Sequence, residues 1–272
     1  MRGKRRSKII LEILGVLLAL IWLSPFYLMI VNAFKTKNGI FTDILGLPEE
    51  WTVDNFKQAF IDLDFLSSFT NSVIVSVGSV ALIILFSSMA GYALARNKTK
   101  LSGIIFMVFV AAMLIPFQSV MIPLISIFGE VNMLNIQGLI FMYLGFGASL
   151  SIFLYHGAMA SIPVSLDEAA TIDGANKWQV FWKIVFPMLK PISVTVMILN
   201  LIWIWNDYLL PSLVLSADTA TLPLKMFFFF GQYTKQWHLA LAGLTIAIIP
   251  VIIVYFFAQK HIIEGVTEGA VK

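Results

Sequence analysis

Residues 161–191 read SIPVSLDEAATIDGANKWQVFWKIVFPMLKP and form a polar stretch between two long apolar segments of the chain. The beginning of this stretch predicts a short helix, because Ser165 can serve as its N-cap with Glu168 as the capping-box partner three residues later. Asp167 and Glu168 also suit the first turn, where the helix dipole stabilises anions. We therefore expect the stretch to open with a helix.

A sharp turn and a second helix should follow. Asp173-Gly174 is expected to end the first helix, since glycine adopts the left-handed conformation of a helix C-terminus without steric cost. Asn176 and Gln179 then have the spacing of another, weaker cap. The stretch is thus predicted to be two helices joined by a tight turn.

The second helix is predicted to be amphipathic. Its apolar residues have the i, i+3, i+4, i+7 spacing of one helix face and are Trp178, Phe181, Trp182 and Val185. Pro187 and Pro191 are expected to end it. Two readings stay open: a plug that fits a groove in a soluble partner, or an interfacial hairpin with its tryptophans at the lipid headgroups.

The composition indicates an integral membrane protein. Hydrophobic residues make up 59% of the chain and charged residues 12%, against about 45–50% and about 25% in soluble domains. The net charge is +3, but the basic residues cluster beside apolar segments, which argues against nucleic-acid binding. The chain has no cysteine, and its three histidines lie on separate segments, so we expect no metal site.

We predict an all-α membrane protein with six transmembrane helices, with approximate bounds 9–34, 71–95, 103–123, 138–159, 192–210 and 237–257. Both termini are expected in the cytoplasm, since this places 13 of the 18 Lys and Arg residues inside and 5 outside. The predicted regions are a basic N-terminus at 1–8, a transmembrane domain at 9–259 that includes the cytoplasmic loop 161–191, and a cytoplasmic tail at 260–272.

A polar and aromatic cluster near the end of the fifth span is a candidate substrate path. Aromatic faces beside amide and carboxylate groups suit sugars, which stack apolar ring faces and hydrogen-bond through hydroxyls. Gln118 lies between two prolines of the third span, where a backbone break could line a cavity. The candidate residues are Gln118, Asn200, Trp205, Asn206, Asp207 and Tyr208. An outer aromatic belt and a plain proline kink are the alternatives.

The 161–191 stretch resembles the EAA loop of ABC importer permeases in the segments Glu168-Ala169-Ala170 and Asp173-Gly174-Ala175, followed by Ile184, Pro187 and Pro191. In that family this loop is the coupling helix that docks into a cytoplasmic ATPase. The resemblance therefore implies ATPase coupling for Glu168, Ala169, Ala170, Asp173, Gly174, Ala175, Trp178, Phe181, Ile184 and Pro187.

Two further segments resemble the carbohydrate-importing branch, in particular the shorter membrane subunit of maltose-type and multiple-sugar systems. They are Trp205–Asp207 and the tail that ends Gly269-Ala270-Val271-Lys272. This resemblance implies the type I ABC importer permease fold. It also implies that the tail, with Glu264 and Glu268, contacts the ATPase subunits.

The resemblance implies a permease subunit that catalyses no reaction and has no catalytic residue. The chain lacks G-x-x-x-x-G-K-[ST], so ATP and Mg²⁺ are expected to be used by a partner ATPase, with no cofactor on this chain. The implied partners are a second, different permease, two ATPase subunits, an extracytoplasmic sugar-binding protein and membrane lipid, in a prokaryotic plasma membrane. The cargo could be an oligosaccharide, a polyol or a sugar phosphate. A secondary transporter would need buried ion sites and internal repeats, and an intramembrane enzyme would need a catalytic motif. We find neither.

Overall fold

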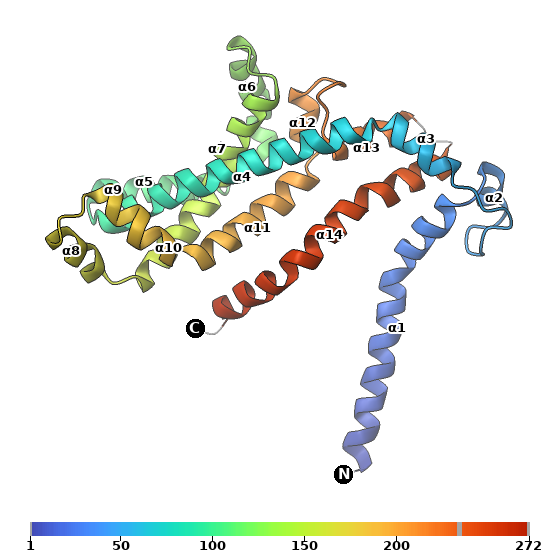
Figure 1. Cartoon of the computed structure of the whole chain (residues 1–272), viewed down its shortest axis with the longest axis horizontal. Helices are drawn as coiled ribbons and strands as arrows, with labels where there is room; N and C mark the ends of the chain where they lie inside the picture. Colours follow the sequence, from blue (N-terminus) through green and yellow to red (C-terminus); the bar gives the residue numbers. More distant parts are fainter. Residues whose placement is uncertain (1, 233–235, 271–272) are drawn as a thin grey trace. The chain divides into compact units, whose positions relative to one another are not determined.

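The computed structural model describes residues 2–232 and 236–270, and within them all the regular secondary structure is helical (Figure 1). This confirms the predicted all-α class. Three helices, Ile10–Ala33, Phe65–Arg96 and Ile136–Ser161, are long and apolar enough to cross a membrane. The number rises to five if each of two sharply bent helix pairs counts as one span.

The chain divides into two compact units, which we describe separately. Unit 1 comprises residues 1–65 and 226–254. Its helices are α1 (Arg2–Ala33), α2 (Lys37–Thr42), α3 (Asp54–Asp62) and the first part of α14 (Trp237–Ala270). A small apolar core is formed by residues of α1, α3 and α14 with Leu63 and Met226, and it consists of Ala33, Ala59, Leu63, Met226, Leu239, Ala240 and Ala242. Helix α3 lies in the loop that follows the first predicted span.

Backbone carbonyls at the end of α1 bond to one buried amide of unit 1. Asn55 Nδ2 donates to the carbonyl oxygens of Ala33 and Lys35, both at 2.8 Å. Lys35 is itself buried and donates through Nζ to the carbonyl of Asp43. The N–H groups of Gly46 and Leu45 donate to the Asp43 carboxylate and lower its pKa. The loop between α1 and α3 is therefore fixed by polar contacts to main-chain groups.

Unit 2 comprises residues 66–225 and 255–272. Its main helices are α4 (Phe65–Arg96), α7 (Ile136–Ala158) and α11 (Lys190–Asn206). Glycines let these helices approach closely: a Cβ on Gly91 of α4 would lie 2.6 Å from the Tyr155 Cβ of α7. A Cβ on Gly147 of α7 would lie 2.4 Å from Ile83 of α4 and 2.7 Å from Asn200 of α11.

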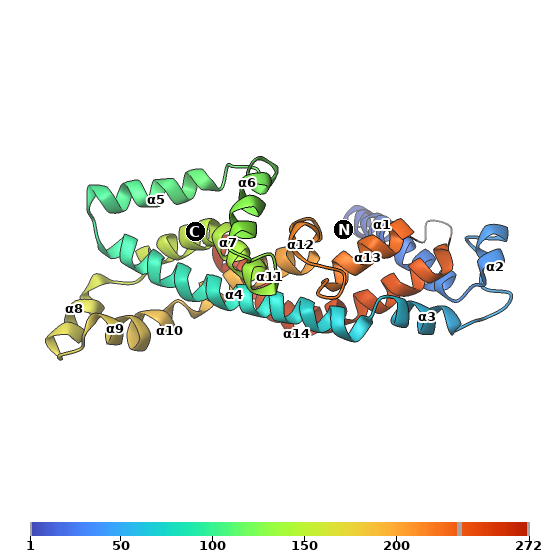
Figure 2. The same cartoon turned by 90° about the horizontal axis from the view of Figure 1, so that it is seen from above.

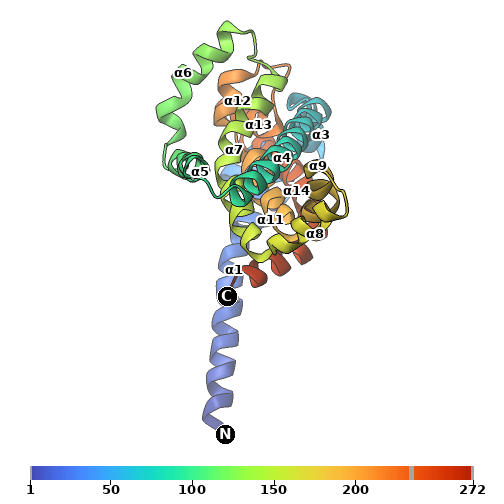
Figure 3. The same cartoon turned by 90° about the vertical axis from the view of Figure 1, so that its left-hand side faces the viewer.

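The segment predicted as a single third span, 103–123, is broken. Helix α5 (Lys100–Ala112) is followed by α6 (Phe117–Glu130), and their axes differ by 104°. Figure 3 shows the change of direction between them. The break lies at residues 113–116, where Pro116 has an extended backbone that cannot continue the preceding helix. The structure thus favours the predicted backbone break over a plain kink.

The fifth predicted span, 192–210, is also shorter than expected. Helix α11 begins at Lys190 and ends at Asn206, because Asp207 adopts an extended conformation. A short helix α12 (Leu209–Val214) follows, and α13 (Leu222–Gln232) comes after it. Helix α14 covers the last predicted span, but the side chains of Glu264 and Glu268 lie outside the described ones.

Candidate functional site

The 161–191 hairpin consists of a short 3₁₀ turn and four helical segments at one end of unit 2. They are η1 (Met159–Ser161), α8 (Val164–Ile172), α9 (Lys177–Val180), η2 (Phe181–Val185) and α10 (Phe186–Met188). Figures 1 and 2 both show α8 and α9 at the end of α4 where that helix terminates. The predicted pair of helices is therefore present.

The predicted cap at Ser165 is wrong. Helix α8 begins at Val164, two residues earlier than a Ser165 cap would place it, because Pro163 has the extended backbone of an N-cap residue. Within the described residues no side chain caps this first turn. Glu168 is exposed instead of completing a capping box, and its carboxylate is left for other contacts.

The turn and the second cap are confirmed. Gly174 has φ +87°, a left-handed conformation in which a branched side chain would be strained. The N–H of Ala175 donates to the carbonyl of Ala170 at 2.9 Å and closes the turn. Asn176 and Gln179 form a complete capping box, with both hydrogen bonds at 2.9 Å.

The second helix is less regular than predicted. Residues 181–185 form a π-helical turn, in which the N–H of Phe186 donates to the carbonyl of Phe181. Pro187 lies inside the following α10 and does not itself end the helix, but the helix does end between the two predicted prolines, Pro187 and Pro191. The break comes at Leu189, and the segments before and after it differ in direction by 74°.

The residues expected to couple to an ATPase separate into two sets. The exposed ones are Glu168, Ala169, Asp173, Gly174, Trp178 and Pro187. Ala170 and Phe181 are buried in the core of unit 2, whereas Ala175 and Ile184 are partly buried against it. The six exposed residues lie on the surface of the hairpin, whereas the other four pack in or against the core of unit 2.

The sequence reasoning missed two residues that fasten this hairpin, Tyr92 and Arg96 in the last turns of α4. Arg96 makes a bidentate ion pair with Asp167, with Nε–Oδ2 at 2.9 Å and Nη2–Oδ1 at 3.1 Å. Tyr92 donates its hydroxyl to Asp167 Oδ2 at 3.0 Å. Arg96 entered the sequence reasoning only as one of the inside charges, because a contact between residues 71 positions apart leaves no local pattern.

Asp207, in the polar cluster near the end of the predicted fifth span, has two hydrogen-bond partners, as a carboxylate close to a predicted span should. Tyr143 of α7, whose side chain is fully buried, donates its hydroxyl to Asp207 Oδ2 at 2.9 Å. The N–H of Leu209 donates to Asp207 Oδ1 at 2.9 Å and starts α12. Asp207 therefore connects α7 to the break between α11 and α12.

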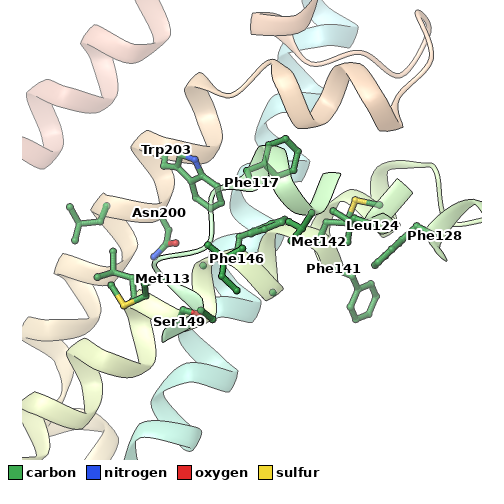
Figure 4. Close-up of a pocket in the computed structure, with 17 residues that line it drawn as sticks. Met113, Phe117, Leu124, Phe128, Phe141, Met142, Phe146, Ser149, Asn200 and Trp203 are labelled. Carbon is green, nitrogen blue, oxygen red and sulfur yellow. The ribbon is translucent and has the colours of Figure 1, made fainter. Parts of the chain in front are cut away.

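A pocket of about 570 Å³ lies between α5, α6, α7 and α11 of unit 2 (Figure 4). Its lining is mostly apolar and includes Phe117, Phe146 and Trp203, with Asn200 and Ser149 among the few polar residues. Asn200 Nδ2 donates to Ser151 Oγ at 3.1 Å and to the carbonyl of Val196 at 2.8 Å.

The structure does not gather the other candidate path residues at this pocket. Of the six, only Asn200 lines it. Asn206 is exposed and donates to the carbonyl of Ile202 in its own helix, and Trp205 packs edge to face against Phe69 with ring centroids 5.8 Å apart. Gln118 and Tyr208 are exposed on α6 and just before α12. In the described part of the chain, no group of three His, Asp or Glu residues could hold a metal ion.

Comparisons with known proteins agree with the fold. Residues 83–268 match the model of a family described as "Binding-protein-dependent transport system inner membrane component". A relative from Thermoanaerobacterium thermosulfurigenes, named "Probable starch degradation products transport system permease protein AmyC", is 53% identical over the full length of both chains.

Two further relatives carry sugar-transport names. The "Multiple sugar-binding transport system permease protein MsmG" of Streptococcus mutans is 38% identical and covers 97% of this chain and 96% of its own. The "Melibiose/raffinose/stachyose import permease protein MelC" of Bacillus subtilis is 35% identical over the full length of both chains.

Among solved structures, a chain of a bacterial ABC transporter involved in import of the acidic polysaccharide alginate has a TM-score of 0.79. It is 24% identical, and the match covers 96% of this chain and 98% of that one. At this identity the likeness shows the fold alone.

Proposed function

Because the chain belongs to the family of inner membrane components of binding-protein-dependent transport systems, we propose that it is the permease subunit of an ATP-driven importer that moves a carbohydrate into the cell. The names of the relatives support an oligosaccharide as cargo. A polyol or a sugar phosphate is the alternative cargo. A self-sufficient secondary transporter is less well supported, since a family of this description works with a binding protein.

The proposed topology has six spans with both termini in the cytoplasm of a prokaryotic cell. The excess of Lys and Arg in the loops assigned to the inside supports this orientation. Three helices qualify as spans on their own, and each of the bent pairs α5–α6 and α9–α11 could supply another. Residues 237–253 of α14 are a shorter apolar helix that would complete the six.

We propose that the exposed face of the 161–191 hairpin docks the ATPase. The exposure of large apolar side chains on that face is the observation that carries the proposal. Glu168, Trp178 and Ile172 are exposed there, and Ile172 exposes 85% of its surface. Large apolar side chains beside a carboxylate, on a rigid hairpin, suit insertion into a groove of a soluble subunit. ATP and Mg²⁺ would then be bound by that partner and not by this chain.

The proposed assembly contains a second, different permease, two ATPase subunits and an extracytoplasmic sugar-binding protein. Glu264 and Glu268 of the tail are proposed to contact the ATPases. For the substrate path, Asn200 has the best support, because it is a polar residue beside the aromatic side chains of the α5–α7–α11 pocket. Gln118, Trp205, Asn206 and Tyr208 stay candidates, whereas the Asp207 carboxylate already has partners within the unit.

Reconstitution of the chain with its partners in proteoliposomes tests this function. Candidate oligosaccharides, polyols and sugar phosphates are supplied with the binding protein, and both ATP hydrolysis and solute uptake are measured. We expect an oligosaccharide to stimulate both. Uptake of solute by this chain without an ATPase would contradict the proposal.

A matched pair of glycine variants tests the role of the hairpin. Gly174→Val places a β-branched residue at φ +87°, so we expect uptake per ATP hydrolysed to fall about tenfold. Gly157→Val is the control, since Gly157 is exposed in α7 and a Cβ there meets nothing within 4 Å. Uptake at the wild-type level in Gly174→Val would remove the hairpin turn from the coupling mechanism.

A further inference from the structure

The last two turns of α4 contact both arms of the 161–191 hairpin. The first arm is α8, and the second consists of α9, η2 and α10. Tyr92 and Arg96 are four residues apart and therefore lie on one face of α4. Arg96 and the Tyr92 hydroxyl bond to Asp167 in α8. The ring of Tyr92 also lies 5.4 Å from the ring of Phe181 in η2. One helix end thus holds the first and the second arm at the same time.

Arg96 also binds the main chain just before α8. Its Nη1 and Nη2 atoms both donate to the carbonyl oxygen of Ile162 at 3.1 Å. The guanidinium therefore makes two bonds to a carboxylate and two to a carbonyl, which a planar fork of five donors allows and a lysine ammonium does not. These contacts fix the position of α8 and the direction from which the chain enters it.

The Arg96 contact is well sheltered and lies on a rigid base. The side chains of Arg96 and Asp167 expose only 15% and 14% of their surface, so the ion pair is screened less than a surface pair. Five residues earlier on α4, Gly91 packs directly against Tyr155 of α7. The end of α4 is therefore fixed to the core of unit 2 and in turn fixes the hairpin.

Two neighbouring carboxylates in the hairpin have different surroundings. Asp167 is partly buried and bonded to α4, whereas Glu168 is exposed on the outer face of α8. Asp167 can hold the hairpin to α4, while the Glu168 carboxylate is available to a partner. This separation means that the hairpin can be loosened without changing its exposed face.

We propose that Arg96 and Tyr92 are positioning residues that fasten the 161–191 hairpin to α4, so that α4 and the hairpin move as one rigid body. If the hairpin docks an ATPase, as proposed above, its displacement is then transmitted directly to α4. This second step rests on the proposed function, whereas the fastening itself does not.

Spin labels test the fastening in the full chain, which has no native cysteine. Ala93→Cys on α4 and Val164→Cys on α8 are both exposed, and labels on them report the distance between α4 and the hairpin in lipid nanodiscs. We expect a narrow distance distribution in the otherwise unchanged chain. Arg96→Gln or Asp167→Asn should broaden it at least twofold, and Arg96→Lys should give an intermediate width. A distribution that stays narrow in both Arg96→Gln and Asp167→Asn would overturn the proposal.

Lys98→Gln is the matched control for the loss of a positive charge, because Lys98 is exposed and lies two residues after Arg96. It should leave the distance distribution unchanged. If Lys98→Gln broadens the distribution as much as Arg96→Gln does, a general charge effect replaces the specific contact, and the proposal fails.

The assembled complex then separates the fastening from the docking function. In the same variants without labels, we expect uptake per ATP hydrolysed to fall about tenfold while ATP hydrolysis continues. A broadened distance with unchanged uptake per ATP would support the fastening and contradict the docking role of the hairpin. A narrow distance with lowered uptake would contradict the fastening and leave the docking role standing.

Discussion

Asp167 and Asp207 are each held by a tyrosine from another helix, yet the two sites balance the negative charge differently. Asp167 accepts hydrogen bonds from Tyr92 and from the Arg96 guanidinium. Asp207 accepts from Tyr143 and from a backbone N–H, and within the described residues it has no basic partner within 4 Å. The comparison indicates that the hairpin site depends on charge, whereas the α11–α12 break depends on hydrogen-bond geometry.

Asp207→Ala should have the largest effect on stability. It leaves the fully buried Tyr143 hydroxyl without its acceptor and removes the hydrogen bond that starts α12. We expect the free energy of unfolding in detergent micelles to fall by about 2–3 kcal/mol, measured by denaturant titration with tryptophan fluorescence. Asp207→Asn keeps an acceptor oxygen and should lose roughly half as much. An unchanged midpoint in Asp207→Ala would show that these bonds contribute nothing.

Asp167→Ala should cost less, about 1–1.5 kcal/mol on the same measurement. Arg96 is 15% exposed and keeps its bonds to the Ile162 carbonyl, so water and the main chain still solvate the guanidinium. If Asp167→Ala lowers the free energy of unfolding by more than Asp207→Ala does, charge pairing contributes more to the stability of this protein than buried hydrogen bonding. That result would contradict the expected order of the two sites.

The tyrosines should follow the same order with smaller effects. Tyr143→Phe removes one bond from a buried group and should cost about 1 kcal/mol. Tyr92→Phe should cost about 0.5 kcal/mol, because Arg96 continues to bind Asp167. Equal losses in the two variants would indicate that the Arg96 ion pair does not compensate for the missing hydroxyl.

The effect of salt on stability should differ between the two sites, and this difference is the smallest effect that we expect. At 1 M NaCl the Debye length is about 3 Å, so the difference in stability between wild type and Asp167→Ala should shrink by about 0.3 kcal/mol. The difference for Asp207→Ala should stay constant, since no ion pair is lost there. Repeating both titrations in sodium chloride provides the measurement. An equal salt dependence in the two variants would argue against the distinction.

Local features were predictable from the sequence. The turn at Gly174 and the capping box of Asn176 and Gln179 depend on residues at most a few positions apart, and both are present. The chemistry of Ser165 suits a cap, but Pro163 is the N-cap residue and the helix starts two residues earlier than predicted. Near Pro116 the sequence allows either a backbone break or a plain kink. The 104° angle between the helices on either side favours the break.

Contacts between distant residues were not predictable. Arg96 meets Asp167 across 71 positions and Tyr143 meets Asp207 across 64 positions. A single sequence carries no periodic or spacing signal for such pairs, because they depend on how α4 and α7 pack against the rest of unit 2. The predicted substrate-path residues do not meet at one site, for the same reason. Gln118 and Asn200 lie on different helices, and the sequence does not determine the distance between those helices.

The π-helical turn at residues 181–185 fixes the permitted length of the hairpin. A π turn contains one residue more than an α turn, so deleting one residue there would let the chain continue as a regular α-helix. The residues before the deletion would rotate by about 100° relative to those after it. Val180 would then turn out of the core, and the exposed Trp178 would point in a new direction. The direction in which the exposed face points therefore depends on the number of residues in this turn. Once the extra residue is lost, no substitution can restore that direction.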